Sequence, residues 1–270
     1  MPMADKRVSI IIPGFNYGHY LKETLDSVLN QDYNEFEIVI VDDGSTDNQT
    51  KKYLSQLNHP KIKVFLKEHE GVCIARNYAI ANSTGDYILP LDADDLIGKD
   101  FIRDAVEILD SDNRVKIVCC KVEMFGAKKG LYPLPEPSLE MLLGQNTMVV
   151  TSMFRRADFE KTNGFNSNMS NGFEDWDFWL SLLDSGGEIY KLDKVGLYYR
   201  IKKGSRNNVL TSAEFKRLRL QIYQNHKGLY ARHFFDPIKS FEYDLIINSK
   251  EYKLGQLLLK PIRIIHKFFN

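Results

Sequence analysis

Five short apolar runs in the first 120 residues alternate with segments whose apolar residues recur every three or four positions. The apolar runs span residues 8–12, 37–41, 62–66, 87–91 and 115–120. The segments of helical periodicity span residues 21–29, 46–57, 71–81 and 101–109. Thr46 opens the second of these, and Gln49 three residues later predicts a capping box. Strands that alternate with helices predict an α/β fold with a mainly parallel sheet and right-handed crossovers.

The pattern changes after residue 120. Residues 130–137 are rich in proline and glycine and predict a loop. Residues 171–183 predict a loop that enters a helix, and this helix is expected to end near Gly186. A further strand is predicted at residues 192–200, and helical structure is predicted from residue 212 onward.

The composition excludes some functions. The chain carries 36 basic and 36 acidic side chains, so a nucleic-acid partner, which usually requires a basic excess, is not expected. Its three cysteines show no metal-ligand spacing and its first residues form no apolar signal segment, which together indicate reduced thiols. No run reaches the roughly 18 apolar residues of a membrane span. We therefore expect a cytoplasmic protein.

Three carboxylates, those of Asp92, Asp94 and Asp95, follow directly on the apolar run at residues 87–91. Crowded carboxylates repel one another unless a cation lies among them. Hard oxygen ligands suit Mg²⁺ or Mn²⁺, and such ions are often held by one or two carboxylates together with substrate phosphates. The cluster therefore predicts a divalent cation that holds a diphosphate at the end of this strand.

Aromatic and polar residues also follow the first two predicted strands. Ligands of open α/β sheets bind beyond the carboxyl ends of the strands, so Phe15, Asp42 and Asp43 are expected near the acidic cluster. Phe15 could stack on a nucleobase, and a carboxylate could accept a base N–H. Arg76, on the third predicted helix, could reach phosphate oxygens. Taken singly, each of these residues has a purely structural explanation: Asp42 and Asp43 as a turn, Phe15 as a core residue and Arg76 as a solvated helix residue. Their joint occurrence at consecutive strand ends favours a functional role instead.

A second acidic group lies in the other half of the chain. Glu174 and Asp175 open a helix whose apolar face includes Trp176 and Trp179. Acidic residues at a helix start are favoured by the dipole and can simply be caps. Beside a metal–diphosphate site, Asp175 becomes a candidate general base, although the dipole is expected to lower its pKa. Residues 198–205 then form a basic stretch that either closes over phosphates or is a solvated turn.

The C-terminal segment combines an apolar stripe with basic side chains. The apolar residues at helical spacing are Leu254, Leu257, Leu258, Pro261, Ile262, Ile265, Phe268 and Phe269, and the flanking basic residues are Lys253, Lys260, Arg263 and Lys267. A basic amphipathic helix is typical of binding to a membrane surface. A terminal helix docked on its own domain, or on a dimer partner, has the same pattern. Peripheral membrane contact through residues 250–270 is thus one of two expectations.

Taken in chain order, these residues resemble the family 2 glycosyltransferases of the GT-A fold. The matching segments are residues 8–13 with Asn16, 40–47, Gly71 with 75–77, 85–88 running into the Asp92-Ala93-Asp94 (DXD) motif, and 174–177. The resemblance covers roughly residues 7–205. It implies a GT-A domain over residues 1–210, with a Rossmann-like nucleotide-binding half to about residue 120 and an acceptor half to 210. A helical C-terminal extension over 211–270 would follow.

The resemblance also implies roles for single residues on the donor side. Pro13 and Phe15 would line the base pocket, and Asp43 would accept a hydrogen bond from the base. Arg76 would approach the diphosphate or the ribose, and Asp92 would face the ribose and the donor sugar.

Around the metal and the acceptor, the resemblance assigns Asp94 to Mn²⁺ or Mg²⁺. Asp175 would deprotonate the acceptor hydroxyl, and Glu174 would position the acceptor or the sugar. Asn16 would join the nucleotide site. Further residues expected beside these groups are Asp42, Asp95, Arg200 and Lys203.

Two features depart from the usual pattern of the family. Members often carry a histidine near the metal in the loop after the late Tyr-Arg strand, whereas residues 201–205 contain none. Water, or Lys203 on the phosphate, would take its place. Processive members carry a Gln-x-x-Arg-Trp motif and flanking membrane helices, and we find neither. The resemblance therefore implies inverting, metal-dependent transfer of a single sugar from a nucleotide diphosphate sugar. UDP is expected by family habit, with a glycan or lipid-linked acceptor hydroxyl in cell-envelope polysaccharide synthesis.

Two alternatives stay open at this point. A nucleotidyltransferase shares a metal–nucleotide sheet but should carry a glycine-rich basic loop after the first strand, where this chain has residues 13–17. A catalytically silent nucleotide-sugar-binding protein would keep the same fold, and the intact metal and base positions argue against it without excluding it.

Overall fold

The computed structural model describes residues 6–169, 171–202, 211–233 and 241–269, with side chains for 243–260 in the last of these ranges. The described residues form a nine-stranded sheet in the order β3-β2-β1-β4-β8-β6-β9-β5, with β7 paired to β6. The strands are β1 (Val8–Gly14), β2 (Phe36–Asp43), β3 (Ile62–Lys67), β4 (Tyr87–Pro90), β5 (Leu96–Ile97), β6 (Val115–Gly126), β7 (Gly130–Leu131), β8 (Met153–Arg155) and β9 (Glu188–Ile201).

Six of these strands run in one direction. β1 pairs in parallel with β2 and β4, β2 with β3, and β6 with β9. The short β8 is antiparallel to both β4 and β6 and therefore joins two halves of the same polarity. The mainly parallel sheet and its six predicted strands, the last of them β9, are confirmed. The short β5, β7 and β8 were not predicted, and β7 lies where a loop was expected.

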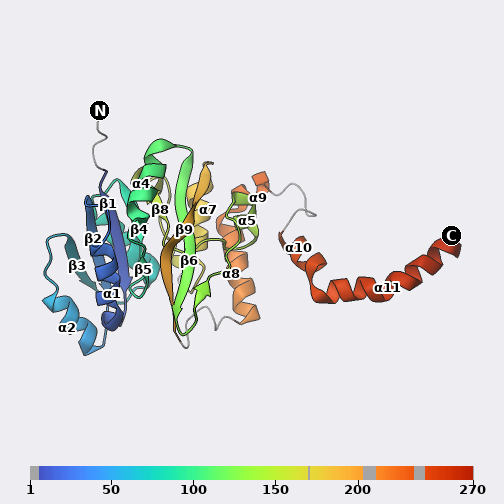
Figure 1. The fold of residues 1–270 in the computed structure, drawn as a ribbon, viewed down its shortest axis with the longest axis horizontal. Coiled ribbons are helices and arrows are strands. Elements are labelled where there is room, and N and C mark those ends of the chain that lie inside the picture. The colour runs from blue at the N-terminus through green and yellow to red at the C-terminus, as the bar shows by residue number, and fades with distance from the viewer. Residues whose placement is uncertain (1–5, 170, 203–210, 234–240, 270) are drawn as a thin grey trace.

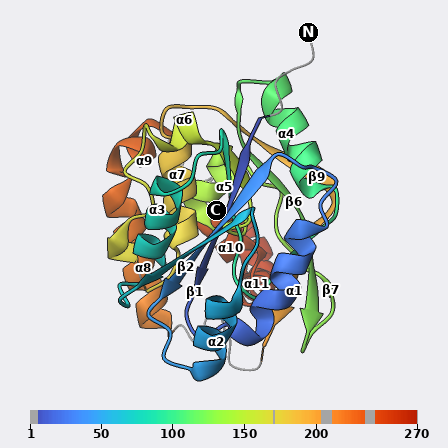
Figure 2. The same cartoon turned by 90° about the vertical axis from the view of Figure 1, so that its left-hand side faces the viewer.

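Helices cover both faces of the sheet (Figure 2). The helices are α1 (Gly18–Leu29), α2 (Asn48–Gln56), α3 (Val72–Ala81), α4 (Phe101–Ser111), α5 (Leu139–Gly144), α6 (Arg156–Phe159), α7 (Glu174–Leu183), α8 (Ser212–Asn225), α9 (Lys227–His233), α10 (Phe241–Asn248) and α11 (Lys250–Phe269), with a 3₁₀ turn at Ser167–Met169. Alternate residues of a strand point to opposite faces. Ile10 and Ile12 therefore join the core under α1 and α4, while Ile11 joins the core under α3 and α7.

The capping box predicted at Thr46 is wrong. The N-cap of α2 is Asp47, whose carboxylate accepts from Thr50 N at 2.7 Å. The backbone N–H of Thr46 instead donates to Asn16 Oδ1 at 2.8 Å. This contact with the preceding loop holds Thr46 outside the helix.

The C-terminal helices fall into two groups. Leu218, Ile222 and Leu229 of α8 and α9 are buried in the core beside α7. Asp177 fixes this contact, because its carboxylate accepts from Asn225 Nδ2 at 2.6 Å. α10 contacts α5, and α11 extends from it away from the body of the molecule (Figure 1). None of the helices in the described ranges has the length and apolar character needed to cross a membrane.

Candidate active site

The parallel strands bring the predicted polar residues to one edge of the sheet. β1 ends at Gly14, β2 at Asp43 and β9 at Ile201, and β4 is followed by the acidic cluster. Because these strands share a direction, their carboxyl ends lie at the same edge. Residues from both halves of the chain therefore meet there.

Each carboxylate of the acidic cluster has a positively polarised partner. Asp92 Oδ1 lies 2.9 Å from an Arg76 nitrogen, and Asp94 Oδ2 lies 2.6 Å from Lys202 Nζ. Asp95 is 2% exposed and accepts from Arg200 N at 2.8 Å. Burial and the Asp92 charge raise the pKa of Asp94, although Lys202 opposes the shift. The same two causes raise the pKa of Asp95 well above its ordinary value.

The acidic cluster fits a divalent cation only if a bound substrate supplies further oxygen ligands to the ion. Within the described ranges, no group of three or more His, Cys, Asp or Glu side chains is placed to hold a metal ion. Asp94 nevertheless holds a cation already, the Lys202 ammonium, so the position favours positive charge. Its carboxylate is a hard oxygen ligand, and Mg²⁺ is commonly held by one or two carboxylates plus substrate phosphates. The residues present fit such a shared site.

The end of β9 supplies the basic side chains. Arg200 donates from Nε to the Asp94 carbonyl oxygen at 2.7 Å and pairs with Glu23 at 2.6 Å. Lys202 Nζ also donates to the Tyr17 hydroxyl at 2.8 Å and lies 4.1 Å from the centre of that ring. Lys203 lies outside the described residues. The basic stretch after β9 thus reaches the acidic cluster through Lys202.

The side predicted for the nucleobase contains Phe15, Asp43 and a histidine that the sequence did not reveal. The rings of Phe15 and His69 lie 4.5 Å apart. Asp43 accepts from the backbone N–H groups of Glu70 and Gly71 at 2.9 and 3.0 Å, and its Oδ2 lies 2.8 Å from His69 Nδ1. Asp43 therefore fixes the start of α3. Since a carboxylate has about four acceptor positions, the partners within the described ranges leave one on Oδ1.

Two other predicted residues brace the loops of this edge. Asn16, at φ 62°, accepts from the backbone of Thr46 and Asp47 at 2.8 and 3.1 Å. Asp42 accepts from Ser45 N at 3.1 Å and from the Ser45 hydroxyl. Pro13 is buried in β1 opposite Val41. These contacts hold the β1–α1 and β2–α2 loops together.

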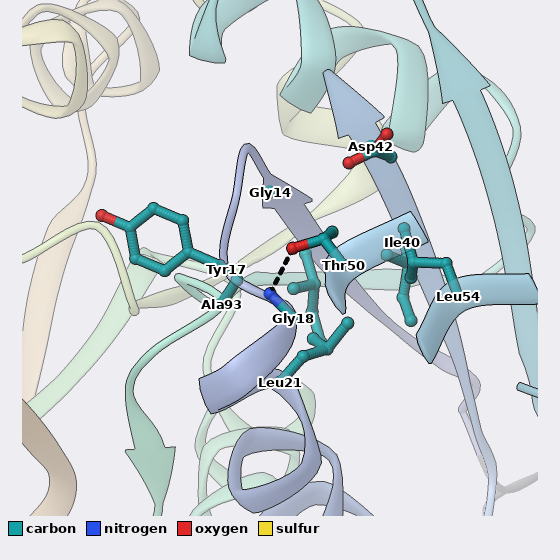
Figure 3. A pocket seen from close by; sticks show the side chains of 10 residues that line it. Gly14, Tyr17, Gly18, Leu21, Ile40, Asp42, Thr50, Leu54 and Ala93 are labelled. Atoms are coloured by element: carbon teal, nitrogen blue, oxygen red, sulfur yellow. Dashed lines mark hydrogen bonds between the residues drawn. The ribbon is translucent and has the colours of Figure 1, made fainter. Parts of the chain in front are cut away.

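A small pocket lies beneath these loops (Figure 3). Most of its lining is apolar, and of the predicted site residues it includes Asp42. Two of the lining residues are joined by a hydrogen bond, in which the Thr50 hydroxyl accepts from Gly18 N at 2.8 Å. Any Cβ at Gly18 would lie 2.4 Å from the Thr50 Cα, which explains the glycine. Figure 3 shows the Tyr17 ring directed away from Ile40 and Leu54, and its hydroxyl accepts from Lys202 Nζ at 2.8 Å.

Arg76 connects the two acidic groups of the chain. Its side chain is 3% exposed and donates to Asp92 Oδ1 and to Glu174 Oε1, both at 2.9 Å. The guanidinium also lies 5.2 Å from the Phe165 ring centre. The structure thus places Arg76 between carboxylates rather than on a solvated helix face. The first turn of α7 is held beside the acidic cluster.

Asp175 is partly exposed next to this bridge. Its Oδ2 accepts from Asn146 Nδ2 at 3.1 Å, and its Oδ1 accepts from Trp176 N at 2.8 Å. Burial and the Glu174 charge raise the pKa of Asp175 to about 7. Desolvation and the like charge of Glu174 therefore outweigh the lowering expected from the helix dipole. Asn146 comes from the loop after α5, and nothing in the sequence marked it.

The fold is shared with solved glycosyltransferases. The structure of S. aureus TarS 1–349 in complex with UDP-GlcNAc superposes with a TM-score of 0.62 at 21% identity, over 93% of this chain and 78% of that chain. Mannosyltransferase PcManGT from Pyrobaculum calidifontis, in complex with GDP-Man and Mn²⁺, gives 0.59 at 19% identity, over 95% and 84%. At this identity the similarity establishes the fold, which is that of the GT-A transferases.

The chain belongs to glycosyl transferase family 2, whose family model matches residues 9–180. The hyaluronan synthase of Pasteurella multocida is 28% identical over 96% of this chain and 27% of its own length. The chondroitin synthase of Escherichia coli is 29% identical over 90% of this chain and 35% of its own length. The chain thus spans about a third or less of these curated relatives.

Proposed function

We propose that this glycosyltransferase moves a single sugar from a nucleotide diphosphate sugar, with UDP as the expected nucleotide, to an acceptor hydroxyl. The acceptor would be a glycan or a lipid-linked saccharide of cell-envelope polysaccharide synthesis. The observation that carries the proposal is the Arg76 bridge, because it holds the acidic cluster and the first turn of α7 in one site. The polysaccharide synthases among the relatives support a saccharide acceptor.

The donor would bind across the carboxyl edge of the sheet. Phe15, whose ring lies 4.5 Å from that of His69, would stack on the base, and Asp43 would accept a base N–H. Asp94 would hold Mn²⁺ or Mg²⁺, and the ion would neutralise the diphosphate and improve it as a leaving group. Asp92 stays one-third exposed beside Arg76 and is available to ribose or sugar hydroxyls.

Asp175 would act as the general base of one displacement. Its carboxylate takes the proton of the acceptor hydroxyl while the acceptor oxygen bonds to the anomeric carbon and the bond to the diphosphate breaks. Attack from the face opposite the leaving group inverts the anomeric centre, so an α-linked donor gives a β-linked product. Glu174 is held by Arg76 and would position the acceptor or the sugar.

The C-terminal helices suit contact with a membrane surface. Leu257 and Leu258 of α11 are each 66% exposed, and Lys253 and Lys260 belong to the same helix. An apolar stripe flanked by basic residues favours an anionic lipid surface. We place the enzyme in the cytoplasm, at the inner face of the plasma membrane.

A panel of UDP- and GDP-sugars with Mn²⁺ and saccharide acceptors tests the proposal. NMR of the product should show one added sugar with an anomeric configuration opposite to that of the donor. A product that retains the donor configuration would contradict the single displacement. Release of nucleoside diphosphate without acceptor would separate an enzyme from a silent binder.

A further inference from the structure

The ammonium of Lys202 occupies the place where the proposed function puts a divalent cation. Its Nζ lies 2.6 Å from Asp94 Oδ2 and 2.8 Å from the Tyr17 hydroxyl, above the Tyr17 ring. The Lys202 side chain is 25% exposed and that of Asp94 is 12% exposed. The pair is thus largely removed from water, which strengthens its attraction.

The charges of the acidic cluster explain why a cation is held there. Asp92 is paired with Arg76, whereas Asp95 receives a backbone N–H of Arg200. The Arg200 side chain donates to the carbonyl oxygen of Asp94 rather than to its carboxylate. Lys202 therefore supplies side-chain positive charge to the Asp94 carboxylate in the free protein.

A divalent cation and this ammonium are incompatible on the same oxygen. A Mg²⁺ ion lies about 2.0–2.1 Å from its oxygen ligands. An ammonium in contact with the same oxygen would then lie only a few ångströms from the divalent ion, and the two cations would repel each other. Lys202 is the first residue after β9, and its flexible four-carbon stem allows Nζ to move while the strand stays in place.

We propose that Lys202 and the divalent cation bind Asp94 in alternation. In the free enzyme Lys202 neutralises Asp94. The entering cation–donor complex displaces the ammonium, which then pairs with the donor diphosphate. This inference rests on the metal site of the proposed function. Under this exchange Lys202 weakens the binding of the bare ion, because it competes for Asp94, and strengthens the binding of the nucleotide, because it pairs with the diphosphate.

Lys202→Met tests the exchange without relying on turnover. Mn²⁺ binding is measured by electron paramagnetic resonance without nucleotide, and UDP binding in the presence of Mn²⁺ is measured by calorimetry. We expect Mn²⁺ alone to bind roughly threefold to tenfold more tightly and UDP to bind more weakly by a similar factor, as expected for a partly buried ion pair. Lys202→Arg, which keeps the charge, should bind Mn²⁺ alone as weakly as the wild type.

Lys191→Met is the matched control. Lys191 lies in β9, the strand that Lys202 follows, pairs with Glu136 at 2.7 Å and has a side chain that is 17% exposed. We expect both affinities of this variant to stay unchanged. Equal or weaker Mn²⁺ binding by Lys202→Met would overturn the exchange and leave the proposed function intact. If the wild type binds UDP equally with and without Mn²⁺, the metal site of the proposed function fails and the exchange fails with it.

Discussion

The environment of Asp175 suits a general base. A carboxylate with an ordinary pKa is a weak base at neutral pH, and the raised pKa of about 7 gives Asp175 a stronger hold on a proton. We expect Asp175→Asn to keep the affinity for a nucleotide sugar and to lose about two to four decades of transfer rate. Calorimetry and a coupled transfer assay check the two halves of this prediction. Turnover at the wild-type rate would remove Asp175 from the mechanism.

Asn146 offers a second test at the same carboxylate. Its hydrogen bond lowers the pKa of Asp175 against the larger effects of burial and Glu174. Transfer requires the ionised base, so the rate should rise with pH and level off above the pKa. Asn146→Ala should shift this rise to higher pH, and Asn146→Asp, which adds a like charge, should shift it further. Identical pH profiles of kcat/KM would show that Asn146 does not act through Asp175.

The site residues could be predicted where a short motif contains them. The acidic cluster and the first turn of α7 each lie within a few residues of chain, so their character is visible in the sequence. Lys202 belongs to the basic stretch singled out at residues 198–205, but its contact with Asp94 depends on the fold. His69 and Asn146 reach the site from separate loops, and only the fold brings them there. Arg76 was expected near phosphate, and its burial between two carboxylates depends on packing that no local pattern records.

At the scale of elements, strands β1 to β3 are joined at the edge opposite the site by a buried carboxylate. Glu37 of β2 is 1% exposed, accepts from Ser9 of β1 at 3.0 Å and pairs with Lys63 of β3 at 2.9 Å. Burial raises the pKa of Glu37, but hydrogen bonds from Lys63 and Thr84 outweigh it and lower the pKa to about 2.

This lowered pKa gives a stability prediction. The contribution of Glu37 is present above about pH 4.5 and is lost as pH falls toward about 2. Glu37→Gln should lower the free energy of unfolding at pH 7 by roughly 2–3 kcal/mol, because Lys63 loses its charged partner. Urea unfolding at pH 7, 4 and 3 should show a smaller decline in the variant than in the wild type. Parallel declines would contradict this role.

Element prediction succeeded where periodicity was long. The five strands and four helices predicted in residues 1–120 each repeat their pattern over several residues. Their boundaries differ from the predicted ones by up to three positions, except that β6 runs to Gly126 where an end at residue 120 was predicted. β5 and β8 contain two and three residues, too few for a periodic signal. The cap of α2 was misplaced because the competing contact of Thr46 comes from Asn16, thirty residues away in sequence.

For the whole molecule, the projecting helix α11 carries a separate prediction. Full-length protein should sediment with vesicles that contain anionic lipid, and a chain ending at Ser249 should not, because α11 supplies both the apolar stripe and the basic residues. Leu257→Asp with Leu258→Asp should lose binding while keeping the transferase domain folded. Equal sedimentation of all three proteins would remove the membrane contact and favour docking on a partner or a second copy.

The cation site shared by Asp94 and the donor diphosphate can be tested by calorimetry. A nucleotide sugar is titrated, with and without Mn²⁺, into the wild type, Asp94→Ala and Asp175→Asn. A ligand held jointly by Asp94, the ion and the diphosphate should bind wild type and Asp175→Asn with similar affinity, and only weakly when Mn²⁺ is omitted. Asp94→Ala should bind weakly in both conditions. Equal affinity of Asp94→Ala and wild type in the presence of Mn²⁺ would contradict a cation between Asp94 and the donor.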